Sequence, residues 1–311
     1  MTGKVKFGIF LSNAFPTEKP TVDSIIRFSI KAEKLGFDSV WLGDHLLWHV
    51  PIFESLTLLS AIAIKTNRIK LGTSVLLLPL RNPIVLAKVL STLDFISKGR
   101  IILGVGIGGE YKKEFEVCRV PLKERARIAE ESIEILRKLW KETKANHHGK
   151  YWGFEDVKMK PKPLQQDGIP IWVGGRSEGA LKRAAKFGDG WIGIFMTPER
   201  FSQSKQKILD YIKMFGRKSS TFTFAYFTYI YTSSDYTKCE KIAAKFLSTG
   251  YRMPFEPLKK YCILGDTQES VKRLEKYRDA GAELIILAPT ATGYKINEQL
   301  KVFSEEIIPN F

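Results

Sequence analysis

Residues 69–106 read IKLGTSVLLLPLRNPIVLAKVLSTLDFISKGRIILGVG, and this stretch contains the pattern that repeats along the whole chain. Its apolar, β-branched ends predict two strands, at 69–78 and 100–106. The segment 83–97 between them predicts a helix, because Pro83 suits a first helical turn and Gly99 suits the position after a helix end. The stretch therefore predicts one strand–helix–strand unit.

The same alternation runs through both halves of the 311-residue chain. Further strands are predicted at 6–11, 38–42, 169–175, 189–195, 221–231 and 283–287, and further helices at 23–35, 54–65, 122–141, 177–188, 197–216, 234–250, 267–281 and after the last strand. Eight strands alternating with helices, with no low-complexity linker, favour a single (β/α)8 TIM barrel domain over residues 1–311. An open doubly wound sheet would require a glycine-rich fingerprint after the first strand, where the chain reads LSNAFPTEKP. Residues 142–168 are predicted to form an insertion with a small hairpin before the fifth strand.

The chain is strongly basic, with 49 Lys and Arg residues against 33 Asp and Glu residues, a formal net charge of +16. Such a field favours anionic ligands. The basic residues are spread through amphipathic segments such as KERARIAEESIEILRKLWKETK rather than gathered in a tail. The charge therefore indicates a solvated surface more than a nucleic-acid interface, and no nucleic-acid recognition motif is present.

Composition also excludes several classes of site and location. Cys118, Cys239 and Cys262 are far apart and the four histidines lack zinc-type spacing, so neither a disulfide framework nor a metal site is expected. No apolar run of about 18 residues occurs, so no membrane-spanning helix is expected. The first residues turn polar too soon for a signal peptide, and we expect a cytoplasmic protein.

In such barrels the active site lies at the carboxyl ends of the strands. The polar and glycine residues that follow the first five predicted strands are Ser12 and Asn13; Gly43, Asp44 and His45; Thr73, Ser74 and Val75; Gly106, Gly108, Gly109 and Glu110; and Gly174, Gly175, Arg176 and Ser177. We expect the site to be built from these residues.

His45 is the best acid–base candidate, because histidine titrates near neutral pH. Asp44 either holds the tautomer of His45 or lies outward as a loop carboxylate. A structural histidine that caps the strand is the alternative interpretation of His45, and His49 is expected to be peripheral. Glu110 and Glu114 are one helical turn apart, so either could be a helix-start carboxylate. That interpretation suits Glu114 better than Glu110, which directly follows the rim.

Two glycine-rich turns predict close approach to a ligand. In Gly174–Ser177 the glycines let the backbone come near, Ser177 can cap the next helix, and Arg176 can bind phosphate oxygens. A plain turn with a good helix cap is the alternative. The run GVGIGGEY does not have the spacing of a dinucleotide fingerprint, and we expect Gly108 and Gly109 to let a flat ring lie near the backbone.

Four pieces of the chain carry a family resemblance: AEKLGFDSVWLGDH at 32–45, the run 69–109, PIWVGGRSEGALKRAAKFGDGW at 170–191 and GDTQESVKRLEKYRDAGAELIIL at 265–287. The sequence resembles the luciferase-like monooxygenase superfamily, and especially its branch that uses the deazaflavin coenzyme F420. The resemblance implies a (β/α)8 barrel, usually a homodimer, with the cofactor ring at the carboxyl rim. It also implies a non-prolyl cis peptide at Ser74–Val75 that backs this ring.

The resemblance further assigns roles to individual residues. His45 would lie near the reacting ring and Glu110 would serve as a proton donor. The turn of Gly174, Gly175, Arg176 and Ser177 would bind the cofactor phosphate. Asp44, Thr73, Ser74, Val75, Gly108 and Gly109 would complete the cofactor site. We find no match to the substrate-binding residues of the family's sugar-phosphate dehydrogenases.

The leading functional hypothesis is an oxidoreductase that moves a hydride between coenzyme F420 and a small organic substrate. The alternative is an FMN-dependent monooxygenase in which reduced flavin activates oxygen. The basic surface favours F420, whose oligoglutamate tail is anionic. A non-catalytic flavin-binding barrel is a third hypothesis, disfavoured by the polar residues at the strand ends.

Overall fold

The computed structural model describes residues 4–15 and 21–311, and in it eight parallel strands close into a barrel. The closure is made by β10, which pairs with β9 on one side and with β12 on the other, while β12 pairs in turn with β1. The barrel strands are β1 (Lys6–Phe10), β2 (Ser39–Leu42), β3 (Lys70–Thr73), β5 (Ile101–Gly106), β8 (Ile171–Gly174), β9 (Gly190–Ile194), β10 (Thr223–Thr232) and β12 (Leu284–Pro289). All eight lie within or overlap the predicted strands, and the TIM barrel is confirmed.

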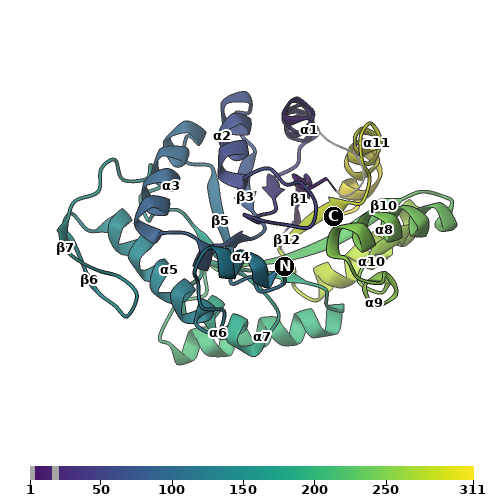
Figure 1. Cartoon of the computed structure of the whole chain (residues 1–311). Helices are drawn as coiled ribbons and strands as arrows, with labels where there is room; N and C mark the ends of the chain where they lie inside the picture. Colours follow the sequence, from purple (N-terminus) through teal and green to yellow (C-terminus); the bar gives the residue numbers. More distant parts are fainter. Residues whose placement is uncertain (1–3, 16–20) are drawn as a thin grey trace.

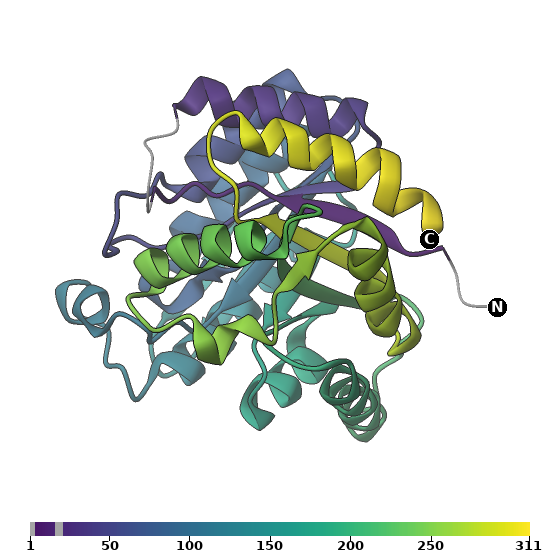
Figure 2. The ribbon, with the colours of Figure 1, turned by 90° about the vertical axis from the view of Figure 1, so that its right-hand side faces the viewer.

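Helices surround this barrel (Figure 1). They are α1 (Val22–Lys34), α2 (Ser55–Lys65), α3 (Pro83–Ser97), α5 (Arg125–Lys141), α6 (Glu178–Phe187), α7 (Pro198–Met214), α8 (Tyr236–Tyr251), α10 (Thr267–Asp279) and α11 (Lys295–Val302). Several begin at a capping side chain that accepts a free backbone N–H, such as Asn82 before α3 and Ser177 before α6. In Figure 2, α11 lies beside α1 and completes the ring.

The structure differs from the elements predicted from the sequence at four places. The predicted strand 69–78 is divided: β3 ends at Thr73, the Ser74–Val75 peptide is cis, and β4 (Leu76–Leu77) pairs with β5 before the short helix η1 (Leu78–Leu80). The predicted helix 122–141 begins only at Arg125, because residues 122–124 form a turn after Pro121. A short helix that the sequence did not predict, α4 (Lys112–Val117), follows β5. Between α8 and α10 the chain adds α9 (Glu256–Lys259) and β11 (Ile263–Gly265), which pairs in parallel with the end of β10.

The remaining elements are peripheral to the barrel. The predicted hairpin before the fifth strand is present as β6 (Ala145–His148) and β7 (Gly153–Val157), paired antiparallel. It lies outside the ring of helices, at the left of Figure 1. The chain ends in the short helices η2 (Phe303–Ile307) and η3 (Ile308–Asn310).

Two tryptophans fill the inside of the barrel. The rings of Trp41 and Trp172 lie 5.4 Å apart and both side chains are buried. Glycines on neighbouring strands make the room: a Cβ on Gly72 would lie 2.3 Å from Cε3 of Trp41, and one on Gly190 would lie 2.7 Å from Cδ1 of Trp172. The lower barrel is therefore a packed core, and the chemistry is confined to the rim.

Candidate active site

His45 is joined to a carboxylate that lies far away in the sequence. Its Nδ1 atom lies 3.0 Å from Oε1 of Glu114, on α4, and the Glu114 side chain is fully buried. The other oxygen, Oε2, accepts the backbone N–H groups of Leu46 and Leu47 at 3.2 and 3.3 Å. Figures 1 and 2 show α4 in front of the barrel, beyond the carboxyl ends of the strands. Glu114 is thus more than a helix-start carboxylate, because it holds both the ring of His45 and the loop that carries it.

An aromatic stack continues from His45. Its ring lies on that of Trp48, with centroids 3.8 Å apart and an angle of 18° between the planes. The indole Nε1 of Trp48 donates to the backbone oxygen of Gly250, in the last turn of α8, at 3.1 Å. His49 packs edge-on against Tyr111, and burial, together with the nearby Arg252, lowers the pKa of His49. The loop after β2 is therefore fixed between α4 and α8.

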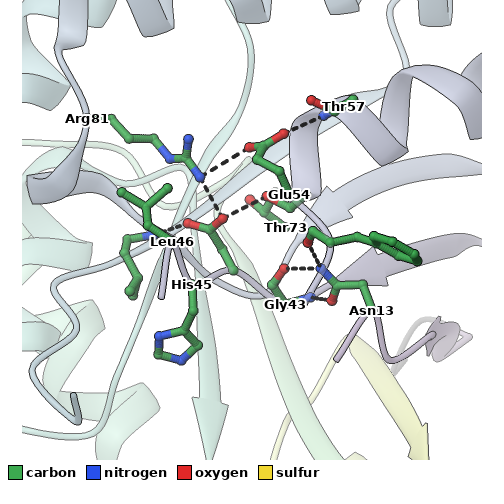
Figure 3. Close-up of polar contacts among 12 residues, drawn as sticks. Asn13, Gly43, His45, Leu46, Glu54, Thr57, Thr73 and Arg81 are labelled. Atoms are coloured by element: carbon green, nitrogen blue, oxygen red, sulfur yellow. Dashed lines mark hydrogen bonds and ion pairs between the residues drawn. The ribbon is translucent and has the colours of Figure 1, made fainter. Parts of the chain in front are cut away.

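Asp44 has a different role from either that the sequence suggested. Its carboxylate is buried, so it is not an outward loop residue. Its Oδ1 accepts from Arg81 at 2.6 Å and from Ser55 at 3.1 Å, and its Oδ2 accepts the N–H of Leu77 at 2.9 Å. Both oxygens are therefore engaged away from His45, whose ring points in the opposite direction from Arg81 (Figure 3).

Asn13, after β1, fixes the start of the same loop. Its side-chain oxygen accepts the N–H of Gly43 at 3.0 Å, and its amide nitrogen donates to the carbonyl oxygens of Gly43 and Phe53 (Figure 3). The side chain is buried, with 1% of its surface exposed. The polar residue after the first strand thus positions the second strand's loop.

The bulge after β3 places Val75 over two neighbouring strands. A Cβ on Gly106 of β5 would lie 2.5 Å from Cγ2 of Val75, and one on Gly174 of β8 would lie 2.7 Å from its Cγ1. Thr73 is anchored below by a 2.7 Å hydrogen bond from its hydroxyl to the backbone oxygen of Gly104. Val75 packs against the inner core of the barrel while remaining partly exposed. The lack of a Cβ at Gly106 and Gly174 therefore leaves the space that the Val75 side chain occupies.

The turn after β8 has the geometry of an anion site at a helix start. Ser177 accepts the N–H of Ala180 and caps α6, and Gly175 has a φ of 123°, which favours glycine. Arg176 is exposed and donates to the backbone oxygen of Phe195 at 2.8 Å, while Arg200 donates to the backbone oxygen of Arg176. Two guanidinium groups therefore lie beside the α6 N-terminus.

The glycine-rich run after β5 is shaped by the chain itself. Gly108 and Gly109 have φ values of 57° and 119°. A Cβ on Gly108 would meet Leu77 and Phe115 at 3.1 Å, and one on Gly109 would meet Arg125 at 3.2 Å. The approach of these two glycines to a flat ring stays a prediction.

Glu110 and a pair of tyrosines lie at the other side of this rim. Glu110 is exposed, and the described residues include no hydrogen bond between it and His45. Burial, with a contribution from the charge of Glu110, raises the pKa of Tyr251 to about 12. The hydroxyl of Tyr251 lies 2.8 Å from that of Tyr229 on β10. Sequence reasoning missed Glu114, Trp48 and both tyrosines, since their contacts join separate parts of the chain.

In residues 4–15 and 21–311, no group of three or more His, Cys, Asp or Glu side chains is arranged to hold a metal ion. None of the helices described there is long and apolar enough to cross a membrane.

Comparison with known proteins agrees with this barrel. The family model for luciferase-like monooxygenases matches residues 5–284, and the chain belongs to the luciferase-like monooxygenase family. An F420-dependent glucose-6-phosphate dehydrogenase of Amycolatopsis mediterranei is 27% identical over 317 aligned residues, which cover 92% of this chain and 93% of the relative. The corresponding enzyme of Kineococcus radiotolerans is 36% identical over 173 residues, 53% of this chain and 50% of the relative.

Solved structures show the same fold at lower identity. An F420-dependent secondary alcohol dehydrogenase in complex with an F420–acetone adduct superposes with a TM-score of 0.86 at 20% identity, covering 98% of both chains. The coenzyme F420-dependent tetrahydromethanopterin reductase of Methanopyrus kandleri superposes with a TM-score of 0.82 at 22% identity, covering 99% of this chain and 100% of that one. These likenesses establish the barrel type.

Proposed function

We propose that this chain is an oxidoreductase that transfers a hydride between coenzyme F420 and a small organic substrate. The observation that carries the proposal is the His45–Glu114 pair at the carboxyl rim, 3.0 Å apart. Family membership supports it, as do the relatives that are named F420-dependent dehydrogenases. The combination of an oriented histidine and a barrel rim suits proton-coupled redox chemistry.

The residues present fit a flat, phosphate-bearing cofactor. The partly exposed Val75, with Ser74 and Thr73, would back the ring, and the absence of Cβ atoms on Gly106 and Gly174 leaves room for the Val75 side chain. Gly174, Gly175, Arg176 and Ser177 would hold the phosphate at the α6 N-terminus. The basic surface would attract an anionic tail. When bound, coenzyme F420 supplies the carbon that accepts or donates the hydride.

His45 would manage the proton that accompanies the hydride. The carboxylate of Glu114 can only accept, so we assign the N–H of the His45 ring to Nδ1, which donates to Glu114. The other ring nitrogen, Nε2, is then free to take a proton. The buried carboxylate also stabilises the imidazolium once it forms, as in other carboxylate–histidine pairs. Trp48 stacks on the ring and limits its rotation. Glu110, exposed on the same rim, is proposed as a second proton donor, while Asp44 acts indirectly by holding the loop.

An FMN-dependent monooxygenase is the second candidate. Structural neighbours include monooxygenases, among them a type II Baeyer–Villiger monooxygenase in complex with FMN, with a TM-score of 0.80 at 19% identity. The bulge and the phosphate turn suit FMN equally well. The higher sequence similarity to F420-dependent relatives and the +16 charge favour F420.

We also propose that the protein is a cytoplasmic homodimer, with α2 and α3 at the interface. The outer faces of these helices carry apolar side chains, with Ile64 70%, Val85 60% and Val89 42% exposed. A cavity of about 400 Å³ lies between them, lined in part by Arg81, Val85 and Val89. Exposed apolar side chains on two neighbouring helices suit a protein partner. Light scattering on the wild type and on V85K/V89E would test the proposal, since the double variant should be monomeric.

Anaerobic titration with coenzyme F420 and, separately, with FMN tests the cofactor assignment. Quenching of tryptophan fluorescence reports binding of either compound. We expect saturable binding of F420 at concentrations at least tenfold below those needed for FMN. Preferential binding of FMN, with oxygen consumption by the reduced complex, would replace the proposal with the monooxygenase. Binding of neither compound would contradict both.

A further inference from the structure

One side of the barrel rim is a continuous surface of aromatic rings, here called the aromatic wall: Phe10, Phe195, Phe227, Tyr229 and Tyr251. Phe10 packs edge-on against Phe227 with centroids 5.1 Å apart, and Phe227 against Tyr229 at 5.2 Å. Phe195 stacks on Tyr229 at 6.0 Å and meets Tyr251 at 5.9 Å. Phe227 and Tyr229 belong to the inner core of the barrel, so the wall continues that core to the rim.

The wall adjoins the proposed reaction centre. Trp48, stacked on His45, bonds to the backbone oxygen of Gly250, and Tyr251 is the next residue. Val75, Phe10, Phe195 and Tyr251 all pack as partly exposed side chains on the same inner core. We therefore expect a molecule held between Val75 and His45 to lie against the aromatic wall.

The wall contains one polar feature, the hydroxyl pair of Tyr229 and Tyr251. Two hydroxyls bonded to each other use only one of their two hydrogens. Among the described residues neither hydroxyl has another hydrogen-bond partner, and Tyr229 is 7% exposed. Burial raises the pKa of Tyr229 well above its usual range, so both groups stay protonated near neutral pH. One O–H donor is therefore left for an oxygen atom of a bound molecule.

Charge argues against a phosphorylated substrate on this surface. The five side chains of the wall carry no charge near neutral pH. Of the basic residues beside it, Arg252 and Lys260 are exposed, and Arg176, which donates to the backbone oxygen of Phe195, belongs to the turn proposed to hold the cofactor phosphate. Moving a phosphate dianion from water onto aromatic rings is costly without paired cations. An uncharged molecule with one oxygen and an apolar group meets no such cost.

We propose that the substrate of this site is an uncharged alcohol, or the matching ketone or aldehyde, whose apolar group lies on the aromatic wall and whose oxygen accepts from the Tyr229–Tyr251 pair. This rests on the proposed function. Oxidation of the alcohol breaks one C–H and one O–H bond: the hydride reduces the oxidised deazaflavin, and the proton passes to His45. The carbonyl product and the reduced cofactor balance the reaction. Although relatives at 27% and 36% identity are named glucose-6-phosphate dehydrogenases, we infer a different substrate class here.

The test is anaerobic reduction of coenzyme F420 by purified protein with 2-propanol, cyclohexanol, benzyl alcohol and glucose 6-phosphate. We expect kcat/KM to be at least a hundredfold higher for the best alcohol than for glucose 6-phosphate. F420 binding, measured separately by fluorescence, distinguishes failure of the proposed substrate class from failure of the proposed function. Binding without alcohol turnover, or with faster turnover of glucose 6-phosphate, would overturn the substrate class alone. Absence of binding would overturn the proposed function and this inference with it.

Variants of the wall give a second readout. Y251F removes one hydroxyl and should raise KM for the best alcohol about 3- to 10-fold, with F420 affinity unchanged. The matched control is Y236F at the other end of α8, whose ring is 48% exposed and outside the wall, and it should behave as wild type. In a series of linear alcohols, we expect kcat/KM to rise with each added methylene. F195A should make this rise smaller, because it removes one ring of the wall on which the apolar group lies. The proposal would be contradicted if Y251F had the KM of wild type and if kcat/KM depended on alcohol chain length in F195A as it does in wild type.

Discussion

Nδ1 of His45 and Oε1 of Glu114 lie 3.0 Å apart, although 69 positions of sequence separate the two residues. Glu114 lies on the six-residue helix α4, whose two buried side chains are this carboxylate and Phe115. The same carboxylate accepts two backbone N–H groups of the loop that carries His45. One buried side chain therefore holds both the ring of the histidine and the loop that carries it, and we assign the N–H of the ring to Nδ1 on this basis.

Replacing Glu114 by glutamine keeps the shape of the side chain and removes its charge. We expect E114Q to lower turnover at least tenfold, because the imidazolium of His45 loses its stabilising carboxylate, while F420 affinity stays within about a factor of three. Steady-state rates and fluorescence titration of the same preparation measure the two effects. The control is E116Q two residues away, whose carboxylate is 69% exposed and pairs with Lys113. Equal losses in both variants would show that α4 matters only for folding.

Adding a methyl group at Gly174 should disturb the bulge. Its Cβ would lie 2.7 Å from Cγ1 of Val75, so we expect G174A to lower the free energy of unfolding by about 1–3 kcal/mol and to weaken F420 binding. Combining it with V75A removes the clash and should recover part of the stability. Chemical denaturation of the three variants measures this. G179A, where a Cβ meets nothing within 4 Å, should be neutral or slightly stabilising in α6.

Removing the charge of Asp44 should destabilise the protein. D44N removes the charged partner at 2.6 Å from the guanidinium of Arg81, whose side chain is 15% exposed, and leaves it with the carboxylate of Glu54 at 3.2 Å. We expect a loss of about 3 kcal/mol in the free energy of unfolding. D38N removes the charge of a carboxylate that is 23% exposed and lies 3.8 Å from the 44% exposed Lys70, and it should cost less than about 1 kcal/mol. Similar small losses in both variants would contradict the role assigned to Asp44.

Glu33 predicts a pH dependence of stability. Burial alone would raise the pKa of Glu33, but the backbone N–H groups of Ile69, Arg68 and Asn67, with the charge of Arg100, lower it overall. A carboxyl whose pKa is lower in the folded state stabilises the fold above its unfolded pKa, about 4.3, and loses this contribution as pH falls through the folded value. Wild type should therefore exceed E33Q in stability at pH 7, and the difference should shrink toward about pH 3. A constant difference over that range would refute the assignment, and E298Q on the exposed face of α11 serves as control.

The barrel could be predicted from the sequence because its signals are local. Each strand is a short apolar run, most of the helices around the barrel have a side-chain cap or a terminal glycine, and eight repeats fit one closed architecture. His45 and the turn at Gly174–Ser177 were found for the same reason, since they directly follow predicted strands. The cis peptide at Ser74–Val75 followed from the family resemblance and is present.

The rest of the site depends on contacts that no local pattern reports. The helix of Glu114 is only six residues long and lacks a side-chain cap, so its sequence KKEFEV carries no helix signal of its own. Asp44 was misplaced because its partner Arg81 lies 37 positions away, beyond the bulge. Tyr229 and Tyr251 meet only because α8 ends beside β10 at the rim.

The most direct test of the central claim compares wild type with H45A in anaerobic hydride transfer between coenzyme F420 and the best alcohol of the panel above. We predict that H45A binds F420 within about a factor of three of wild type and that its kcat falls by about 10²- to 10⁴-fold, the usual contribution of a general acid–base residue. Full turnover in H45A, with unchanged cofactor binding, would contradict the account.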